Sequence, residues 1–239
     1  MSISKLSKIY IAGHNGMVGS ACLRKLKSKG YNNLTFLGSK ELDLRNQKKV
    51  ESFISAEKPD IIIDAAAIVG GIWANNEYPY RFLMENMLIQ NNLIKSAVDN
   101  KVKKFIFLGS SCIYPKLAPQ PLKEEYLLSS TLEPSNQWYA IAKISGVKLI
   151  QAIRKEFGYD YVSLMPTNLY GPNDNYDLKT SHVLPALIRK FHEGKVNYLN
   201  SVSLWGSGSP LREFLHVDDL SSAVLFSIEN ELDDSIYNI

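Results

Sequence analysis

Short apolar runs alternate with longer amphipathic segments along most of the chain. The runs are rich in Ile, Val, Phe and Leu and end at turn residues, as buried strands do, whereas the amphipathic segments repeat their apolar positions near helical spacing. Strands and helices in alternation predict an α/β fold with a Rossmann-like, doubly wound parallel sheet. The predicted strands cover residues 8–12, 34–37, 61–67, 105–109 and 161–165, and the predicted helices cover 18–26, 46–57, 82–98 and 139–157.

Residues at the ends of these segments support the helices. Asn46 is a predicted N-cap, Pro59 prevents the helix before it from continuing, and Gly158 closes the last long helix. In "FLHVDDL" we treat His216 as structural and expect Asp218 and Asp219 to cap a helix that begins near Leu220.

The pattern changes at about Tyr170, where the sequence becomes richer in Gly, Pro, Asn and Ser. The stretches "YGPNDNYD" and "WGSGSP" predict loops on either side of a helix at 183–192. We therefore expect a larger domain at 1–169 and a smaller region at 170–239. The smaller region is expected over the carboxyl ends of the strands, where folds of this kind bind ligands.

Composition narrows the class of protein further. The chain has 239 residues, 45% of them hydrophobic and 21% charged, which is typical of a globular protein. The formal net charge of +3 is small and the lysines are scattered, so we expect no nucleic-acid partner. Its two cysteines, Cys22 and Cys112, lie far apart without a Cys-x-x-Cys or Cys/His cluster. They predict neither a disulfide framework nor a metal site, and they favour the reducing cytoplasm.

No membrane association is expected from the sequence. No apolar stretch approaches the roughly 20 residues that a spanning helix needs. The first predicted strand begins so close to Met1 that we expect no signal peptide before it.

Three glycines, Gly13, Gly16 and Gly19, follow the first predicted strand in "YIAGHNGMVGS". A glycine-rich turn between a strand and a helix lets the backbone approach a pyrophosphate, whose charge then lies at the helix N-terminus. The same short pattern also occurs in tight turns that bind nothing. Taken alone, the motif leaves both interpretations open.

A second candidate site combines a serine-rich strand end with a tyrosine and a lysine. Tyr139 and Lys143 form "YAIAK", and four residues apart on a helix they share one face, where an ammonium favours the phenolate. One such pair is expected by chance in a chain of this composition. Ser110, Ser111 and Cys112 end the strand before this helix, where a hydroxyl can bind a substrate carbonyl while the tyrosine delivers a proton.

The order of these features resembles the extended, nucleotide-sugar-modifying branch of the short-chain dehydrogenase/reductase superfamily. Within it, six blocks are similar to the GDP-L-fucose synthase family, the bifunctional GDP-4-keto-6-deoxy-D-mannose 3,5-epimerase/4-reductases. The resemblance runs from about Lys8 to the last residue. The blocks are "GHNGMVGS", "FLGSSCIYP", "YAIAK", "MPTNLYGPNDN", "SHVLPALIRKFH" and "WGSGSPLREFLHVDDL".

The resemblance implies catalytic roles for five residues. It assigns Ser110, Tyr139 and Lys143 to reduction of the C4 ketone, and Cys112 and His182 to epimerisation at C3 and C5 as an acid/base pair. A thiol and an imidazole suit proton exchange near neutral pH. Without the resemblance, Cys112 is more simply a small buried residue, and His182 a cap or a surface residue.

The resemblance also implies NADP(H) as cofactor, a GDP-sugar substrate and a homodimer that packs segments 82–98 and 139–157 of each subunit. The domain at 1–169 would then bind the dinucleotide and carry the catalytic residues, and 170–239 would bind substrate. The implied substrate contacts are Lys190, Trp205 and Arg212. The implied cofactor contacts are Gly13, His14, Asn15, Gly16, Met17, Val18, Gly19, Ala65, Ala66, Ala67, Leu108, Gly109, Ser110, Ser111, Tyr139, Lys143, Pro166, Thr167, Asn168, Leu169 and His182.

Two features depart from the family pattern. Asn15 and Ser39 stand where family members commonly have arginines that bind the 2′-phosphate of NADPH. We still expect NADP(H), because Lys40 is adjacent and could bind that phosphate, and because no acidic residue directly follows "LTFLG". The chain ends at "SIYNI", which reads like the start of a further strand, and we expect the sugar-nucleotide pocket to be incomplete.

Two other functions remain as alternatives. One is a C4 reductase, with or without epimerisation, of a GDP-6-deoxy-heptose intermediate. The other is a dinucleotide-binding redox sensor that does not turn over substrate.

Overall fold

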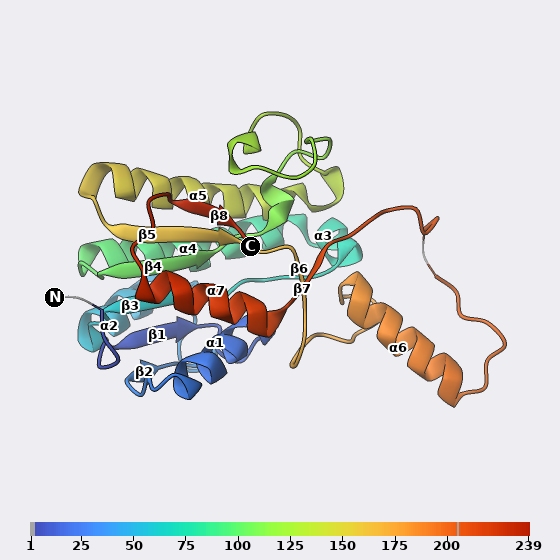
Figure 1. The fold of residues 1–239 in the computed structure, drawn as a ribbon, viewed down its shortest axis with the longest axis horizontal. Coiled ribbons are helices and arrows are strands. Elements are labelled where there is room, and N and C mark those ends of the chain that lie inside the picture. Colours follow the sequence, from blue (N-terminus) through green and yellow to red (C-terminus); the bar gives the residue numbers. More distant parts are fainter. Residues whose placement is uncertain (1–2, 205) are drawn as a thin grey trace.

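The computed structural model describes residues 3–204 and 206–239, and within them it confirms the predicted α/β fold. A six-stranded parallel sheet has the strand order β2-β1-β3-β4-β5-β8 (Figure 1). The chain order reverses between β1 and β3, so the sheet is doubly wound. The strands are β1 (Ile9–Ala12), β2 (Leu34–Thr35), β3 (Ile61–Asp64), β4 (Lys104–Leu108), β5 (Asp160–Met165) and β8 (Ile236–Asn238).

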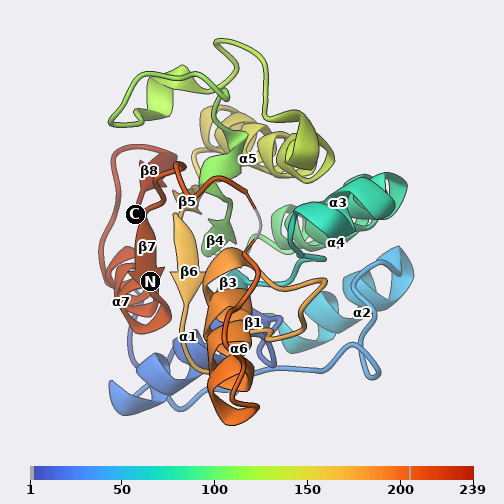
Figure 2. The ribbon, with the colours of Figure 1, turned by 90° about the vertical axis from the view of Figure 1, so that its right-hand side faces the viewer.

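Helices cover both faces of this sheet, as Figure 2 shows. One face packs against α1 (Met17–Ser28) and α7 (Val217–Glu229), and the other against α2 (Gln47–Glu57), α4 (Pro79–Asp99) and α5 (Gln137–Phe157). Because successive strand residues point to opposite faces, each buried strand contributes to two apolar clusters.

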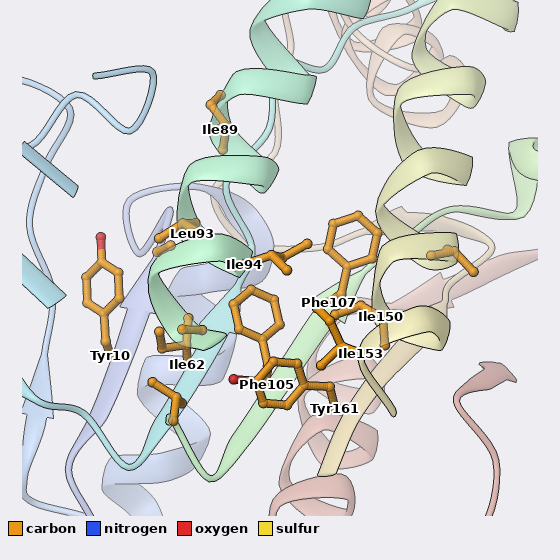
Figure 3. Close-up of a cluster of buried hydrophobic side chains, with 14 of the residues drawn as sticks. Tyr10, Ile62, Ile89, Leu93, Ile94, Phe105, Phe107, Ile150, Ile153 and Tyr161 are labelled. Carbon is orange, nitrogen blue, oxygen red and sulfur yellow. The ribbon is translucent and has the colours of Figure 1, made fainter. Parts of the chain in front are cut away.

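The larger cluster lies between the sheet and helices α4 and α5, as Figure 3 shows. Tyr10, Ile62, Phe105 and Phe107 enter it from three neighbouring strands, and all are fully buried. Isoleucines and leucines of the two helices fill the space above these rings. This packing fixes α5, and every residue it carries, relative to the end of β4.

The helix ends follow the sequence with one exception. The Asn46 side chain accepts a hydrogen bond from the Lys49 N–H (3.1 Å), and Gly158 closes α5 with φ +70°, so both predicted caps are confirmed. The predicted cap of α7 is wrong: the helix begins at Val217, ahead of Leu220. His216 Nδ1 accepts the Asp218 N–H (3.2 Å), so the histidine is the cap and the aspartates lie in the first turn, where the helix dipole favours them.

Residues 171–204 and 206–213, which we call the arm, extend away from the sheet at its carboxyl edge (Figure 1). Two short parallel strands, β6 (Asn168–Tyr170) and β7 (Phe214–His216), pair where the arm leaves and returns. The arm carries α6 (Val183–Val196). After the arm, α7 packs on α1 and β8 pairs with β5, so the last residues rejoin the main sheet.

The remaining elements are short. They are α3 (Ile72–Glu77) and three 3₁₀ helices, η1 (Ser111–Ile113), η2 (Glu124–Tyr126) and η3 (Pro134–Asn136). In the part of the chain that the structure describes, no helix is long and apolar enough to cross a membrane.

A buried lysine ties the start of β4 to the end of α7. The Lys104 side chain is 1% exposed, and its Nζ donates to the carbonyls of Ser227 and Asn230 (both 2.6 Å) and pairs with Asp160 (2.8 Å). Lys103 beside it is 41% exposed and pairs with Asp60 (2.6 Å) at the surface.

We expect Lys104→Met to lower the free energy of unfolding by about 3 kcal/mol, because it removes the donor of two carbonyls and the nearer of the two cations that pair with Asp160. Lys103→Met is the matched control and is expected to cost less than about 1 kcal/mol, as exposed ion pairs do. Urea unfolding of both variants measures the difference. Equal losses would contradict a special role for the buried lysine.

Candidate active site

The glycine turn lies where the strand order reverses, between the carboxyl ends of β1 and β3. Gly13 has φ +78°, and a Cβ there would lie 2.6 Å from the Ala65 carbonyl oxygen. A Cβ on Gly19 would collide with the Gly13 carbonyl, and the Gly16 N–H donates to that same oxygen (3.0 Å). The backbone is packed so closely here that a side chain at Gly13 or Gly19 would push the turn apart.

The first turn of α1 is suited to an anion. Gly16 is its N-cap and brings no capping side chain, and the turn contains no acidic residue. Its backbone N–H groups and the positive end of the helix dipole therefore face the turn without a protein carboxylate to satisfy them. These features fit the pyrophosphate of a dinucleotide, and they favour the phosphate-binding interpretation of the motif.

Ser110 and Cys112 are held at the end of β4 by backbone hydrogen bonds to β5 and to the residue that follows it. The Gly109 N–H donates to Leu164 O (2.9 Å), and the Ser111 N–H donates to Pro166 O (3.1 Å). Ser110 Oγ accepts the Cys112 N–H (3.3 Å) at the start of η1. The serine hydroxyl and the cysteine thiol therefore lie at one edge of the sheet.

Lys143 brings α5 to the same edge. Its side chain is 3% exposed, and its Nζ donates to the Leu108 carbonyl (2.8 Å). The ammonium lies 4.7 Å from the centre of the Phe107 ring and 5.8 Å from that of Tyr139, so the predicted Tyr139–Lys143 juxtaposition is present. Burial lowers the pKa of Lys143, while Asp64 and Cys112 oppose that shift.

Burial also governs the acids of this cluster. It raises the pKa of the Tyr139 phenol, with Cys112 and Asp64 adding to the effect. It raises the pKa of the Cys112 thiol to about 11, although a hydrogen bond with Ser110 and the charge of Lys143 act in the opposite direction. Near neutral pH both groups keep their protons, so the phenol can donate one and the thiol is uncharged.

His182 lies on a different element, as the N-cap of α6. The Gly71 N–H donates to Thr180 O (2.9 Å) and holds the start of this helix against the loop that follows β3. The side chain of His182 is exposed, yet partial desolvation lowers its pKa, with Asp174 opposing. The structure thus brings Ser110, Cys112, Tyr139 and Lys143 together and holds His182 at the base of the arm.

Two of the expected substrate contacts, Lys190 and Arg212, lie on the arm. Lys190 on α6 is half-buried and donates to Ser203 O (3.4 Å), and Arg212 is exposed and donates to Leu211 O (2.7 Å). Trp205 lies outside the described residues. Both cations make these hydrogen bonds within the arm and lie outside the cluster at the sheet edge.

The other expected cofactor contacts follow the ends of the strands. Residues 65–67 follow β3, and residues 166–169 connect β5 to β6. His14 packs on the Phe36 ring (4.8 Å between centroids), while Asn15, Ser39 and Lys40 are exposed beyond the glycine turn and β2. Glu41, absent from the expected site, turns back so that its carboxylate accepts the Gly38 N–H (2.8 Å).

The sequence interpretation missed Asp64, the last residue of β3. Its side chain is fully buried, and it interacts electrostatically with both Lys143 and Tyr139. The available signal was a carboxylate that ends an otherwise apolar strand in "IIIDAAA". No group of three or more His, Cys, Asp or Glu side chains suited to a metal is found among the described residues.

Comparisons with known proteins show the family to which the chain belongs. Residues 9–239 match the NAD dependent epimerase/dehydratase family. GDP-L-fucose synthase 1 of Arabidopsis thaliana is 59% identical over 225 residues, which make up 94% of this chain and 70% of that protein. The match therefore extends over nearly all of the chain.

Two solved structures share the fold. A GDP-D-glycero-L-gluco-heptose synthase of Campylobacter jejuni, solved in the presence of NADPH, is 35% identical with a TM-score of 0.91, covering 99% of this chain and 81% of the other. A GDP-L-fucose synthetase of Naegleria fowleri bound to NADP is 30% identical with a TM-score of 0.89, covering 100% and 78%.

The fold and the site define an enzyme of the extended short-chain dehydrogenase/reductase class, as expected from the sequence. The chain belongs to the NAD dependent epimerase/dehydratase family, in the branch formed by the GDP-L-fucose synthases, and it is an NAD(P)-binding enzyme.

We expect Gly13→Ala to weaken NADPH binding at least ~10-fold, because the new methyl group would displace the turn from the Ala65 carbonyl. Gly30→Ala is the matched control: Gly30 also has a positive φ (+83°), but nothing lies within 4 Å of its Cβ position. It is expected to lose about 1 kcal/mol of stability and no cofactor affinity. Fluorescence titration with NADPH distinguishes the two, and equal affinities would argue against the turn as the cofactor site.

Proposed function

We propose that this chain epimerises C3 and C5 of GDP-4-keto-6-deoxy-D-mannose and then reduces C4 with NADPH, giving GDP-L-fucose. The observation that carries the proposal is the cluster of Ser110, Cys112, Tyr139 and Lys143 at the edge of the sheet that also holds the glycine turn. Relatives that carry the GDP-L-fucose synthase name match nearly the whole chain and support the choice of substrate.

In the reduction, Ser110 orients the C4 carbonyl and Tyr139 donates a proton to its oxygen. The bound nicotinamide would supply the hydride. Lys143 stabilises the phenolate that remains after proton transfer, and its hydrogen bond to Leu108 O fixes the ammonium at the required place. The raised pKa of Tyr139 suits a donor that must be protonated when substrate arrives.

In the epimerisation, the C4 ketone acidifies the protons on C3 and C5. Each inversion needs one group to remove a proton from one face and another to return a proton to the opposite face. We assign this exchange to Cys112 and His182. Lys143 supports it by favouring the thiolate form of Cys112 against the effect of burial.

We propose NADP(H) as the cofactor. The support comes from solved structures of similar proteins, one determined in the presence of NADPH and another bound to NADP. The charges near the expected 2′-phosphate position have opposite effects on the choice between NADPH and NADH, because Lys40 would attract the phosphate and Glu41 would repel it. Binding of NADPH and NADH to this chain is compared directly in the assay below.

The division of labour between segments is likewise a proposal. Residues 1–169 carry the cofactor site and the catalytic cluster, and the substrate-binding region falls within 170–239, mainly on the arm. Lys190 and Arg212 there would neutralise the diphosphate of the GDP-sugar, and Trp205 would contribute an apolar face. A cytoplasmic location stays a prediction from the cysteine usage.

A second candidate is C4 reduction of a GDP-6-deoxy-heptose intermediate, favoured by the likeness to the Campylobacter jejuni heptose synthase. It uses Ser110, Tyr139 and Lys143 in the same roles. The non-catalytic redox sensor gains no support from the structure, because a sensor has no need for the half-buried Tyr139 and the buried Lys143 beside Ser110.

The deciding experiment follows NADPH oxidation with GDP-4-keto-6-deoxy-mannose in deuterated water, with NADH in parallel and product analysis by mass and NMR. Oxidation with label at both C3 and C5 would support the bifunctional reaction. Oxidation without label would make the chain a plain C4 reductase, and no oxidation would redirect the assay to heptose-derived substrates.

Single substitutions separate the two half-reactions. Tyr139→Phe is expected to slow NADPH oxidation about 100-fold or more while label still exchanges into C3 and C5. Cys112→Ala is expected to suppress the exchange. Cys22→Ala, which removes the chain's other thiol from the buried face of α1, is the matched control and should leave both steps unchanged. Normal exchange in Cys112→Ala would refute the assignment of the thiol.

We further propose that the chain forms a homodimer through α4 and α5. Tyr80, Met84 and Leu88 recur every four residues on α4 and are 73%, 39% and 38% exposed. On the adjacent α5, Trp138 and Ile141 are 38% and 40% exposed. Large apolar side chains gathered on two packed helices support a subunit interface there.

We expect Met84→Lys with Leu88→Lys to convert the dimer to a monomer, because each lysine would be desolvated against its symmetry mate. Sedimentation velocity measures the change in mass. A Phe191→Lys variant controls for charge added at another exposed apolar position, on α6, and should leave the mass unchanged. A wild-type monomer would overturn the proposal.

A further inference from the structure

Asp64 occupies an unusual place for a carboxylate. In the parallel register it lies between Ala12 of β1 and Phe107 of β4. Side chains at paired positions point to the same face, and Phe107 packs against α5. The carboxylate therefore enters the interface between the sheet and α5, on the face from which Lys143 approaches.

The carboxylate is incompletely satisfied there. It is 0% exposed; Oδ1 accepts the Ala66 N–H (3.2 Å), and Oδ2 accepts no hydrogen bond from the described residues. A buried acceptor without a donor costs folding free energy, and a buried charge costs more. Burial raises the pKa of Asp64 to about 6, against the opposing influence of Lys143 and the Ala66 N–H.

The titratable groups that face Asp64 come from two elements, α5 and β1. Lys143 on α5 supplies the positive charge, and Tyr139 on the same helix interacts with the carboxylate as a titratable acid. Tyr10 on β1 interacts with it as well, and its buried hydroxyl also lacks a hydrogen-bond partner. Among these groups only Lys143 gains from a negative charge, because its own burial disfavours the ammonium.

We propose that Asp64 is a positioning residue for the reaction: its buried carboxylate keeps the Lys143 ammonium charged and directed toward Tyr139, at a cost in folding stability. The inference rests on the reductase function proposed above. It also explains why a carboxylate is buried here. Packing alone does not require one, because an apolar side chain would fill the same site without the folding free energy that the buried carboxylate costs.

The predicted cost of the Asp64 carboxylate to folding stability can be tested without an enzyme assay. In an unfolded chain an aspartate has a pKa of about 3.9, so the folded protein holds its proton up to higher pH and loses stability as pH rises through 4 to 6. We expect Asp64→Asn to match the wild type near pH 4 and to exceed its Tm by about 5 °C at pH 7.5. A lower Tm at pH 7.5 would show a purely structural role and overturn the proposal.

A double-mutant cycle tests the partner. Without the Lys143 ammonium, the buried Asp64 carboxylate costs more folding free energy. The gain in Tm from Asp64→Asn at pH 7.5 should therefore be larger in a Lys143→Met background than in the wild type. An equal gain would show that the two groups do not interact and would overturn the proposal. Should Lys143→Met fail to fold at pH 7.5, its rescue by Asp64→Asn serves as the same readout.

The proposed effect of Asp64 on catalysis is tested by measuring kcat as a function of pH. Loss of the carboxylate lowers the pKa of Lys143, so in Asp64→Asn the alkaline fall of kcat should move down by about one pH unit, with KM for NADPH unchanged. Tyr10→Phe, which alters a neighbouring buried group without a charge, should leave the profile in place. An unmoved profile in Asp64→Asn would overturn the catalytic role. An inactive wild type would instead refute the proposed function, and the stability cycle would still decide the interaction.

Discussion

The parallel register of the central strands is the constraint on which the rest of the structure depends. Because β1, β3, β4 and β5 run in one direction, their carboxyl ends meet at one edge. The glycine turn, the buried aspartate, the serine–cysteine segment and the start of β6 all follow from those ends. An antiparallel arrangement would divide the same residues between two edges, and no common site would form.

At this edge, burial is the largest cause of the pKa shifts of the titratable groups. It raises the pKa of the Cys112 thiol and the Asp64 carboxyl and lowers that of Lys143, so every group in the cluster is pushed toward its neutral form. The ammonium is held by the Leu108 carbonyl, the Phe107 ring and the charge of Asp64. Such a site favours a protonated phenol at Tyr139, as the proposed role of proton donor requires.

The arm differs from the sheet in how much of its apolar surface is buried. Its helix α6 exposes Val183, Ile188 and Phe191, and Lys190 and Arg212 make hydrogen bonds within the arm, whereas β1, β3 and β4 bury every one of their residues. Under the proposed function, the buried sheet would hold the cofactor and the reacting groups, and the arm could vary with the substrate, as in other folds that support several chemistries.

The sequence by itself determined most of the helices and strands and the residues that we propose as reacting groups, because these depend on local patterns. Apolar periodicity predicted the strands and helices, and the spacing in "YAIAK" placed Tyr139 and Lys143 on one helical face. Only the tertiary structure decided what surrounds them. That Asp64 faces Lys143 depends on strand register, and that His216 caps α7 depends on where that helix begins. The return of α7 and β8 to the main sheet depends on long-range packing that no local pattern records.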